Sequence, residues 1–525
     1  MAAVSRRAFI GGGVLAGVGL AVGLPFALEG TGRHSTGEQL RSTARLPRSF
    51  TLPLRLPPTL RPSSTEEGVD RYMMTTRGAT AHILPGLTTP ILGFEGVFPG
   101  PTIESRRGRP VAVRHRNRLP IPIVVHLHGG HTPHESDGYP TDDIYPQDMT
   151  YLHRHQGMTG MDGHAPMPAG DVSHGERVYR YPMQQRAAML WYHDHRMDFT
   201  GPSVWRGLAG LHIVRDDEED ALGLPRGRYE LPLVLTDRAF DADGSLLYPS
   251  VDATLVNTPG VTDPYVAGVL GDVMLVNGVP WPFADVDRAT YRLRFLNACN
   301  ARRLRLRLDP EPHDGLLQIG TEGGLLAAPL QHDSFELAPA QRLDALVDFS
   351  RFPVGALVTL YDDFADGRMH QIMRFRVGER VGPRFTAPAT LSTIEPLDPT
   401  KATVTRTFRF QRGSVGHRDG WIINEEPFSP TSVAARPKLG DIEIWQLFAD
   451  FHHPVHVHLD PFQVVGRGIY GPGPFDAGWK DTIDLSPGEQ ARIAVRFRDH
   501  PGRFVFHCHN LEHEDMAMMA NFVTA

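Results

Sequence analysis

The chain contains few cysteines and no excess of basic residues. Only 2 of its 525 residues are cysteine, so a framework of disulfide bonds does not hold the fold together. Lysine and arginine number 53 and aspartate and glutamate number 60, which gives a formal net charge of −7. This balance argues against a broad basic surface and therefore against a nucleic-acid partner. With 41% hydrophobic and 22% charged residues, the composition is that of a globular protein.

Long apolar runs are also missing, except at the N-terminus. Arg6 and Arg7 precede an apolar, glycine-rich run from Phe9 to Leu28, and residues 1–30 resemble a twin-arginine signal segment. We expect export through that pathway to the periplasm, the cell surface or the exterior. No clear cleavage site follows, so the alternative is a signal retained as a membrane anchor. Residues 31–65 are rich in Arg, Pro, Ser and Thr and are expected to form a linker or a wrapping arm.

After residue 65 the chain is dominated by short alternating runs bounded by glycine and proline. Such runs predict half-buried strands, and they include Thr102–Val113, Tyr291–Leu296, Arg303–Leu308, Ile442–Leu447 and Arg492–Phe497. A proline-rich turn followed by a strand recurs three times, beginning at residues 96, 276 and 423. Three copies of one β-sandwich unit would explain the length. We therefore expect an all-β protein with domains at 66–217, 228–380 and 400–525.

Histidine is abundant, with 26 residues, and it is concentrated in pairs. Four His-x-His pairs lie in strand-like sequence: His126 and His128, His193 and His195, His456 and His458, and His507 and His509. Residues i and i+2 of a strand point to the same face, so each pair presents two imidazoles to one side. Eight imidazoles are enough for two or three metal ions. Imidazole suits copper, zinc, iron and nickel, so the pairs alone do not name the metal.

Cys508 lies between two of these histidines and restricts the choice of metal. Alternation directs its side chain to the face opposite His507 and His509, where a second metal site is expected. His453, His513 and Met518 are close enough in sequence to join it. Two histidines, one cysteine and a weak axial methionine form a blue-copper electron-transfer site. The alternative for Cys508 is an inert buried thiol. Cys299 is expected to be a small core residue.

Together these motifs resemble those of the three-domain multicopper oxidases, in the branch of bacterial spore-coat laccase, bilirubin oxidase and phenoxazinone synthase. The family motifs stand here as HLHGG (126–130), WYHDH (191–195), HPVHVH (453–458) and HCHNLEHEDMAMM (507–519), and GWKDTIDLSPGE (478–489) also matches. The resemblance covers about residues 80–525. It implies three cupredoxin-like Greek-key β-sandwiches, with one copper site in the third domain and a trinuclear cluster between the first and third.

The resemblance also implies four copper ions per chain and a role for each ligand. The type 1 copper would take His453, Cys508, His513 and, axially, Met518, and electrons would enter through His513. The type 2 copper would take His126 and His456. The two type 3 coppers would take His128, His193, His195, His458, His507 and His509. Asp137 and Glu514 match positions that supply protons in this branch; the alternative is that both are solvent-facing or turn residues.

The implied reaction is laccase-like. One-electron oxidation of phenols, aromatic amines or tetrapyrroles would be coupled to the four-electron reduction of O2 to water. The alternatives are a cuprous or other metal-ion oxidase for copper tolerance, an o-aminophenol oxidase of the phenoxazinone synthase type, an exported protein that has lost its copper, and an electron carrier with only the blue site. The expected partners are O2 and a small organic reductant or metal ion, and a monomer is favoured.

One segment departs from the family pattern. Residues 141–178 are longer than this branch usually shows, and they contain Met149, Met158, Met161, Met167, His153, His155, His164 and His174. Thioethers favour Cu(I) and imidazoles favour Cu(II). One hypothesis is therefore a copper-collecting loop at residues 147–176, and the alternative is an ordinary solvated loop.

Overall fold

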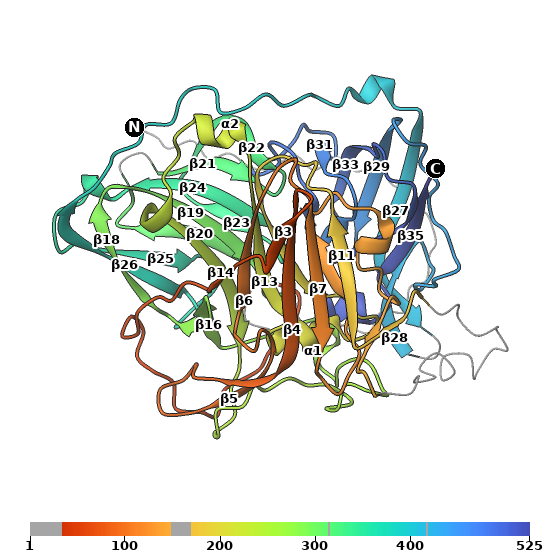
Figure 1. Ribbon diagram of the computed structural model, residues 1–525, viewed down its shortest axis with the longest axis horizontal. Coiled ribbons are helices and arrows are strands. Elements are labelled where there is room, and N and C mark those ends of the chain that lie inside the picture. The colour runs from red at the N-terminus through yellow and green to blue at the C-terminus, as the bar shows by residue number, and fades with distance from the viewer. Residues whose placement is uncertain (1–33, 149–169, 313–314, 416–417) are drawn as a thin grey trace, which may run out of the picture.

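Three pairs of packed β-sheets make up the protein (Figure 1). The computed structural model describes residues 34–148, 170–312, 315–415 and 418–525. The predicted signal at 1–30 and most of the Met- and His-rich loop therefore lie outside the described residues. Within the described ranges there are three short α-helices, α1 Thr200–Trp205, α2 Asp217–Ala221 and α3 Leu511–Asp515. None of the helices described is long and apolar enough to cross a membrane.

The first sandwich packs two five-stranded sheets against each other. One sheet has the order β11-β7-β4-β3, with β5 added to β4, and the other has the order β2-β6-β13-β12-β8. The strands are β2 Thr59–Leu60, β3 Ser64–Glu66, β4 Val69–Ala81, β5 Thr89–Phe94, β6 Gly100–Arg106, β7 Val111–Asn117, β8 Val125–His128, β11 Glu176–Tyr181, β12 Ala188–Asp194 and β13 Ala209–Arg215. Val113 from one sheet and Val125 and Leu190 from the other meet in one buried core. Beside it, β9 Ile144–Tyr145 and β10 Ser173–His174 pair at the base of the long loop.

The central sandwich combines a seven-stranded and a five-stranded sheet. Their orders are β17-β16-β14-β19-β24-β21-β22 and β18-β26-β25-β20-β23. The strands are β14 Glu230–Arg238, β16 Val273–Val276, β17 Val279–Pro280, β18 Phe283–Arg288, β19 Thr290–Asn297, β20 Leu304–Asp309, β21 Leu316–Thr321, β22 Gly324–His332, β23 Phe335–Leu337, β24 Arg342–Asp348, β25 Leu357–Asp362 and β26 Gln371–Val381. Leu293 and Leu306 from opposite sheets lie in its core. In Figure 1 this sandwich is the green part.

The third sandwich, blue in Figure 1, has sheets of the order β28-β27-β29-β33-β31 and β32-β30-β34-β35. The strands are β27 Val404–Val415, β28 Arg418–Ile423, β29 Ile442–Ala449, β30 His453–Val457, β31 Phe462–Arg467, β32 Thr482–Leu485, β33 Gln490–Arg496, β34 Gly502–Cys508 and β35 Met519–Thr524. Leu447 and Ile493 pack against Val455 and Phe506 of the facing sheet. The all-β prediction is confirmed.

Four of the five strands predicted from alternation coincide with β19, β20, β29 and β33. In β20 the leucines are buried, as predicted, and Arg305 and Arg307 form ion pairs with Glu336 and Asp363. The prediction of one strand over Thr102–Val113 is wrong. Gly108, at a φ of 76°, and Pro110 turn the chain between β6 and β7, which lie in opposite sheets. A single alternating run can therefore include the turn at which the chain passes from one sheet of the sandwich to the other.

Residues 34–65 cross the central sandwich as an arm and then enter the first. Its short strand β1 (Glu38–Gln39) pairs with β15 (Val269–Leu270), and Pro53 forms a bridge to Phe283. Strands β2 and β3 then join the two sheets of the first sandwich. The arm therefore ties two sandwiches together along the chain.

Replacing Leu293 by alanine should destabilise the central sandwich. This side chain is fully buried in β19, so a cavity in the core should cost about 2–5 kcal/mol of unfolding free energy. The measurement is urea unfolding followed by circular dichroism, read as the midpoint of the transition of this sandwich. Leu357→Ala is the matched control, because Leu357 lies in the same sandwich and is 49% exposed. Equal midpoints for the two variants would contradict the packing described.

Candidate metal centre

The four His-x-His pairs come from two pairs of neighbouring strands. In the first sandwich β8 lies antiparallel to β12, with His126 opposite His193. In the third, β30 lies antiparallel to β34, with His456 opposite His507. Imidazole rings of the two strand pairs stack on one another across the boundary between the first and third sandwiches. His126 stacks on His458 with 3.9 Å between ring centroids, and His128 stacks on His456 with 3.6 Å.

The imidazole nitrogens gather in small sets of the size that a metal ion needs. In each set, one ring nitrogen per residue lies within 4.8 Å of the others. The sets are His128, His193 and His509; His195, His458 and His507; and His126 and His456 with His128. All eight imidazoles are buried. The first two sets divide the six residues expected at the type 3 pair into two triads, a division that the sequence alone did not supply.

The chemistry of these nitrogens fits bound metal ions. Among the described residues, several buried ring nitrogens have no hydrogen-bond partner: Nε2 of His126, His193 and His456, Nδ1 of His128 and His195, and both ring nitrogens of His509. Burial, the largest cause, lowers the pKa of His193 to about 3 and that of His195 to about 4. Burial also lowers the pKa values of five other cluster residues well below 6.5, namely His126, His128, His456, His458 and His509. Neutral imidazoles with unshared lone pairs are metal ligands, and an unpaired buried nitrogen otherwise costs about 1–3 kcal/mol.

Backbone carbonyls hold the opposite nitrogen of several rings. The Nδ1 atom donates to Asp137 O in His126 (2.5 Å), to Asp194 O in His193 (2.9 Å), to Asp481 O in His456 (2.8 Å) and to Cys508 O in His507 (3.0 Å). A carbonyl accepts only, so each contact places the proton on Nδ1 and leaves Nε2 as the ligand atom. The fold therefore selects the tautomer as well as the position of these rings.

Two buried carboxyl groups contact the same cluster. Asp137 Oδ2 lies 2.7 Å from His458 Nδ1, and burial raises the pKa of Asp137 well above its usual value. Glu514 Oε2 lies 3.1 Å from His507 Nδ1, and Oε1 accepts a 2.8 Å hydrogen bond from Thr200. Burial alone would raise the pKa of Glu514, but the charges of His507 and His195 lower it to about 2. Neither side chain faces solvent.

The neighbouring residue of β34 belongs to a different site. Cys508 Sγ lies 3.4 Å from His453 Nδ1 and 3.6 Å from His513 Nδ1, and the two nitrogens are 3.1 Å apart. This trio is fully buried on the opposite face of the strand, as alternation predicts. Met518 lies in the same core cluster as Cys508, whereas Met519 lies in another. The backbone of Met518 also bonds to both Cys508 and His513.

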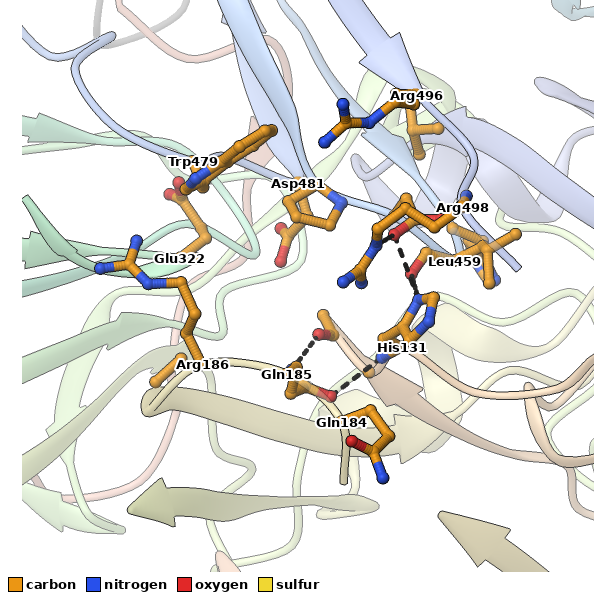
Figure 2. Close-up of a pocket in the computed structure, with 18 of the residues that line it drawn as sticks. His131, Gln184, Gln185, Arg186, Glu322, Leu459, Trp479, Asp481, Arg496 and Arg498 are labelled. Atoms are coloured by element: carbon orange, nitrogen blue, oxygen red, sulfur yellow. Dashed lines mark hydrogen bonds and ion pairs between the residues drawn. The ribbon is translucent and has the colours of Figure 1, made fainter. Parts of the chain in front are cut away.

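A cavity of about 340 Å³ joins the surface to the histidine cluster (Figure 2). Its wall runs from exposed Arg107 to buried His126, His456 and His458. All three sandwiches contribute to it, and Figure 2 shows Gln185 of the first, Glu322 of the central and Trp479 and Asp481 of the third around one space. Small molecules therefore have a route to the cluster.

Comparisons with known proteins agree with this geometry. Sequence models of the multicopper oxidase family match residues 75–156, 151–219 and 394–525. The chain is 34% identical to a laccase of Bacillus subtilis, over 89% of this chain and 96% of that protein. The chain belongs to the multicopper oxidase family. It is 31% identical to a bilirubin oxidase of Albifimbria verrucaria, over 90% of this chain and 81% of that one. A multicopper oxidase structure from Pediococcus acidilactici superposes with a TM-score of 0.78 at 30% identity, over 93% of each chain.

This membership confirms the predicted fold class of cupredoxin-like sandwiches and the predicted copper chemistry. The enzyme is a laccase-like oxidoreductase that binds copper and uses O2 and a reductant.

Several residues around the multicopper oxidase sites were missed by sequence reasoning. Asp450 Oδ1 lies 2.8 Å from His453 Nε2, and Asp481 Oδ1 lies 3.1 Å from His128 Nε2. Trp421 stacks on His513 with 3.7 Å between centroids. Asp481 could have been found, because it belongs to the GWKDTIDLSPGE segment that resembles the family. The hydrogen bond from His513 Nε2 to Ala267 O, at 3.1 Å, left no sequence signal because any residue has a carbonyl.

The metal-free chain should lose stability in mild acid. His193 and His195 have folded pKa values of about 3 and 4, below the unfolded value of 6.5, so the unfolded chain binds more protons between those values. The free energy of unfolding should therefore fall as pH falls from about 6.5 toward about 3. In His195→Asn the slope should be smaller by about 1.4 kcal/mol per pH unit between about pH 4 and pH 6.5. Urea titrations of apoprotein at several pH values measure this, with His370→Asn, at a partly exposed imidazole, as the control. A wild-type slope in His195→Asn would contradict the description of the cluster.

Proposed function

We propose that this oxidase holds four copper ions and oxidises small aromatic reductants. Copper held at Cys508 would supply one-electron oxidation of the reductant, and copper held by the eight histidines would supply the four-electron reduction of O2 to two waters. The observation that carries the proposal is the alternation around Cys508. Strand β34 and the residue directly after it present a thiol to one site and two imidazoles to the other, so the two sites are joined through a few covalent bonds.

The histidine and cysteine ligands are assigned from the sets of nearby nitrogen and sulfur atoms, and Met518 from the family resemblance and its place in the core cluster of Cys508. His453, Cys508, His513 and Met518 would hold the type 1 copper. His126 and His456 would hold the type 2 copper. The type 3 coppers would be held by the triads His128, His193 and His509, and His195, His458 and His507. Support for the assignment comes from the unpaired nitrogens of six of the eight cluster histidines among the described residues.

We assign proton supply to Asp137 and Glu514, in different ways. Asp137 is the better proton carrier, because burial raises its pKa and its Oδ2 is 2.7 Å from His458 Nδ1. Glu514 is ionised in the metal-free chain, and its carboxylate lies 3.6 Å from His195 Nδ1 and 3.1 Å from His507 Nδ1, so its first task is to orient these two rings by its charge. It is the second candidate for moving a proton toward the cluster.

We propose phenols, aromatic amines or tetrapyrroles as reductants, with His513 as the residue through which electrons enter. The alternative is a cuprous or other metal-ion oxidase for copper tolerance, which the Met and His content of residues 147–176 favours. An o-aminophenol oxidase of the phenoxazinone synthase type is a narrower form of the first proposal. We further propose a monomer exported by the twin-arginine signal, in contact with a membrane only where that signal is retained.

Oxygen uptake by the copper-loaded protein tests the choice of reductant. An o-aminophenol or a dimethoxyphenol is compared with Cu(I) under identical conditions, and faster uptake is expected with the organic substrate. Cys508→Ser is the control, because it removes the thiolate of the type 1 site and leaves the eight imidazoles of the histidine cluster unchanged. Much faster uptake with Cu(I) would replace the proposal with a metal-ion oxidase. Uptake that persists in Cys508→Ser would show that electrons do not pass through the type 1 site.

Asp137→Asn should separate proton supply from electron supply. Asparagine keeps the size of the side chain but cannot release a proton, so reoxidation of the reduced enzyme by O2 should slow by about 10²–10⁴-fold. The blue absorption should stay intact, because the type 1 residues are untouched. Stopped-flow mixing of reduced enzyme with O2 gives the rate, and Asp171→Asn, at an exposed carboxylate of the same sandwich, is the control. Turnover at the wild-type rate would remove Asp137 from the mechanism.

A further inference from the structure

The central sandwich contributes none of the proposed copper ligands, yet one of its arginines reaches the histidine cluster. We propose that Arg342 is a positioning residue, which holds the carboxylate of Asp481 so that Asp481 orients His128 and His456. The inference rests on the proposed function, because Arg342 would act on the type 2 copper held by His456 and on the adjacent type 3 copper held by His128. It gives the central sandwich a direct part in building a metal site between the other two.

The contact between the two residues is bidentate and buried. Arg342 is the first residue of β24 and is 1% exposed. Its Nη1 donates to Asp481 Oδ1 at 2.8 Å, and its Nη2 donates to Asp481 Oδ2 at 2.5 Å. Two parallel charge-assisted hydrogen bonds fix the plane of a carboxylate as well as its position. A lysine offers one point charge and does not reproduce this geometry.

Asp481 uses its remaining acceptors on two imidazoles. Its Oδ1 is 3.1 Å from His128 Nε2, and its backbone carbonyl accepts a 2.8 Å hydrogen bond from His456 Nδ1. These two rings are the ones that stack at 3.6 Å across the boundary between the first and third sandwiches. The carboxylate contacts His128 directly, and its Oδ1 lies 3.7 Å from His456 Nδ1. A shift of the carboxylate therefore changes how His128 of the first sandwich faces His456 of the third.

Further hydrogen bonds fix the position of Arg342, so it can determine the orientation of the Asp481 carboxylate. Its Nε donates to Met189 O of β12 in the first sandwich at 3.1 Å. Its backbone N–H donates to Glu322, and Glu322 forms a buried 2.7 Å ion pair with Lys480. Since Lys480 precedes Asp481 in the chain, a closed network ties the three sandwiches together beside the cluster. Glu322 and Asp481 both lie on the wall of the cavity in Figure 2.

The first glycine of the HLHGG motif makes room for the pair. A Cβ atom on Gly129 would lie 2.5 Å from Arg342 Nη2 and 2.7 Å from Asp481 Oδ2, and Gly129 has a φ of 81°. Both atoms belong to the ion pair itself. A glycine directly after His128 is therefore needed for the arginine and the aspartate to close on each other beside that ligand.

The test compares type 2 copper in Arg342→Gln and Arg342→Lys with the wild type. The copper-loaded full-length proteins are dialysed against increasing chelator, and the type 2 and type 1 signals are measured by electron paramagnetic resonance. Loss of an outer contact of this kind typically weakens metal affinity by about 10–100-fold. We expect that loss for the type 2 copper in Arg342→Gln, a smaller loss in Arg342→Lys, and an unchanged blue absorption in both.

Arg294→Lys is the matched control. Arg294 is equally buried and pairs with Asp344 and Glu230 inside the central sandwich. This variant should lower stability and leave the ratio of type 2 to type 1 signal as in the wild type. A wild-type ratio in folded Arg342→Gln would overturn the inference, and where that variant does not fold, the ratio in Arg342→Lys decides. Absence of a type 2 signal in the wild type would instead overturn the proposed function.

Discussion

The structure depends on the contact between two pairs of strands that, with the residues directly after them, carry eight buried imidazoles. Polar rings of this kind do not form a boundary between sandwiches by apolar packing, because each unpaired nitrogen costs free energy when it leaves water. The rings nevertheless stack across the boundary, His126 on His458 and His128 on His456. Metal ions offset that cost by binding the unpaired nitrogens. Copper binding should therefore strengthen the association of the first and third sandwiches.

The pleat of β34 then explains why one protein contains two kinds of site. His507 and Cys508 are adjacent, and a strand directs adjacent side chains to opposite faces. The pairing with β30 places His456 opposite His507 and Val455 opposite Cys508, so the register of one strand pair fixes both sites at once. A shift of one residue would exchange the faces and destroy both. The strand is therefore at the same time the scaffold and the connection between the sites.

Much of this could be predicted from the sequence, because the determining signals are local. The i, i+2 spacing identifies the paired imidazoles, and the position of Cys508 between His507 and His509 separates the two sites. The turn between β6 and β7 was missed, since alternation continues through Gly108 and Pro110. The contacts from Ala267 and Arg342 were also missed. Ala267 acts through a backbone carbonyl, and Arg342 lies 139 residues from Asp481, so only tertiary packing brings them to the sites.

These two contacts indicate what a sandwich without ligands does in such an enzyme. Ala267 accepts from His513 beside the type 1 residues, and Arg342 binds Asp481 beside the cluster, so the central sandwich touches both sites. His513 is fully buried beneath Ala267 and Trp421, and a reductant on the surface does not touch its ring. Electron transfer needs no such contact, whereas ligand exchange at the metal would. The cover therefore keeps solvent and foreign ligands from the thiolate of Cys508, and under the proposed function electrons would cross it from a reductant at the surface.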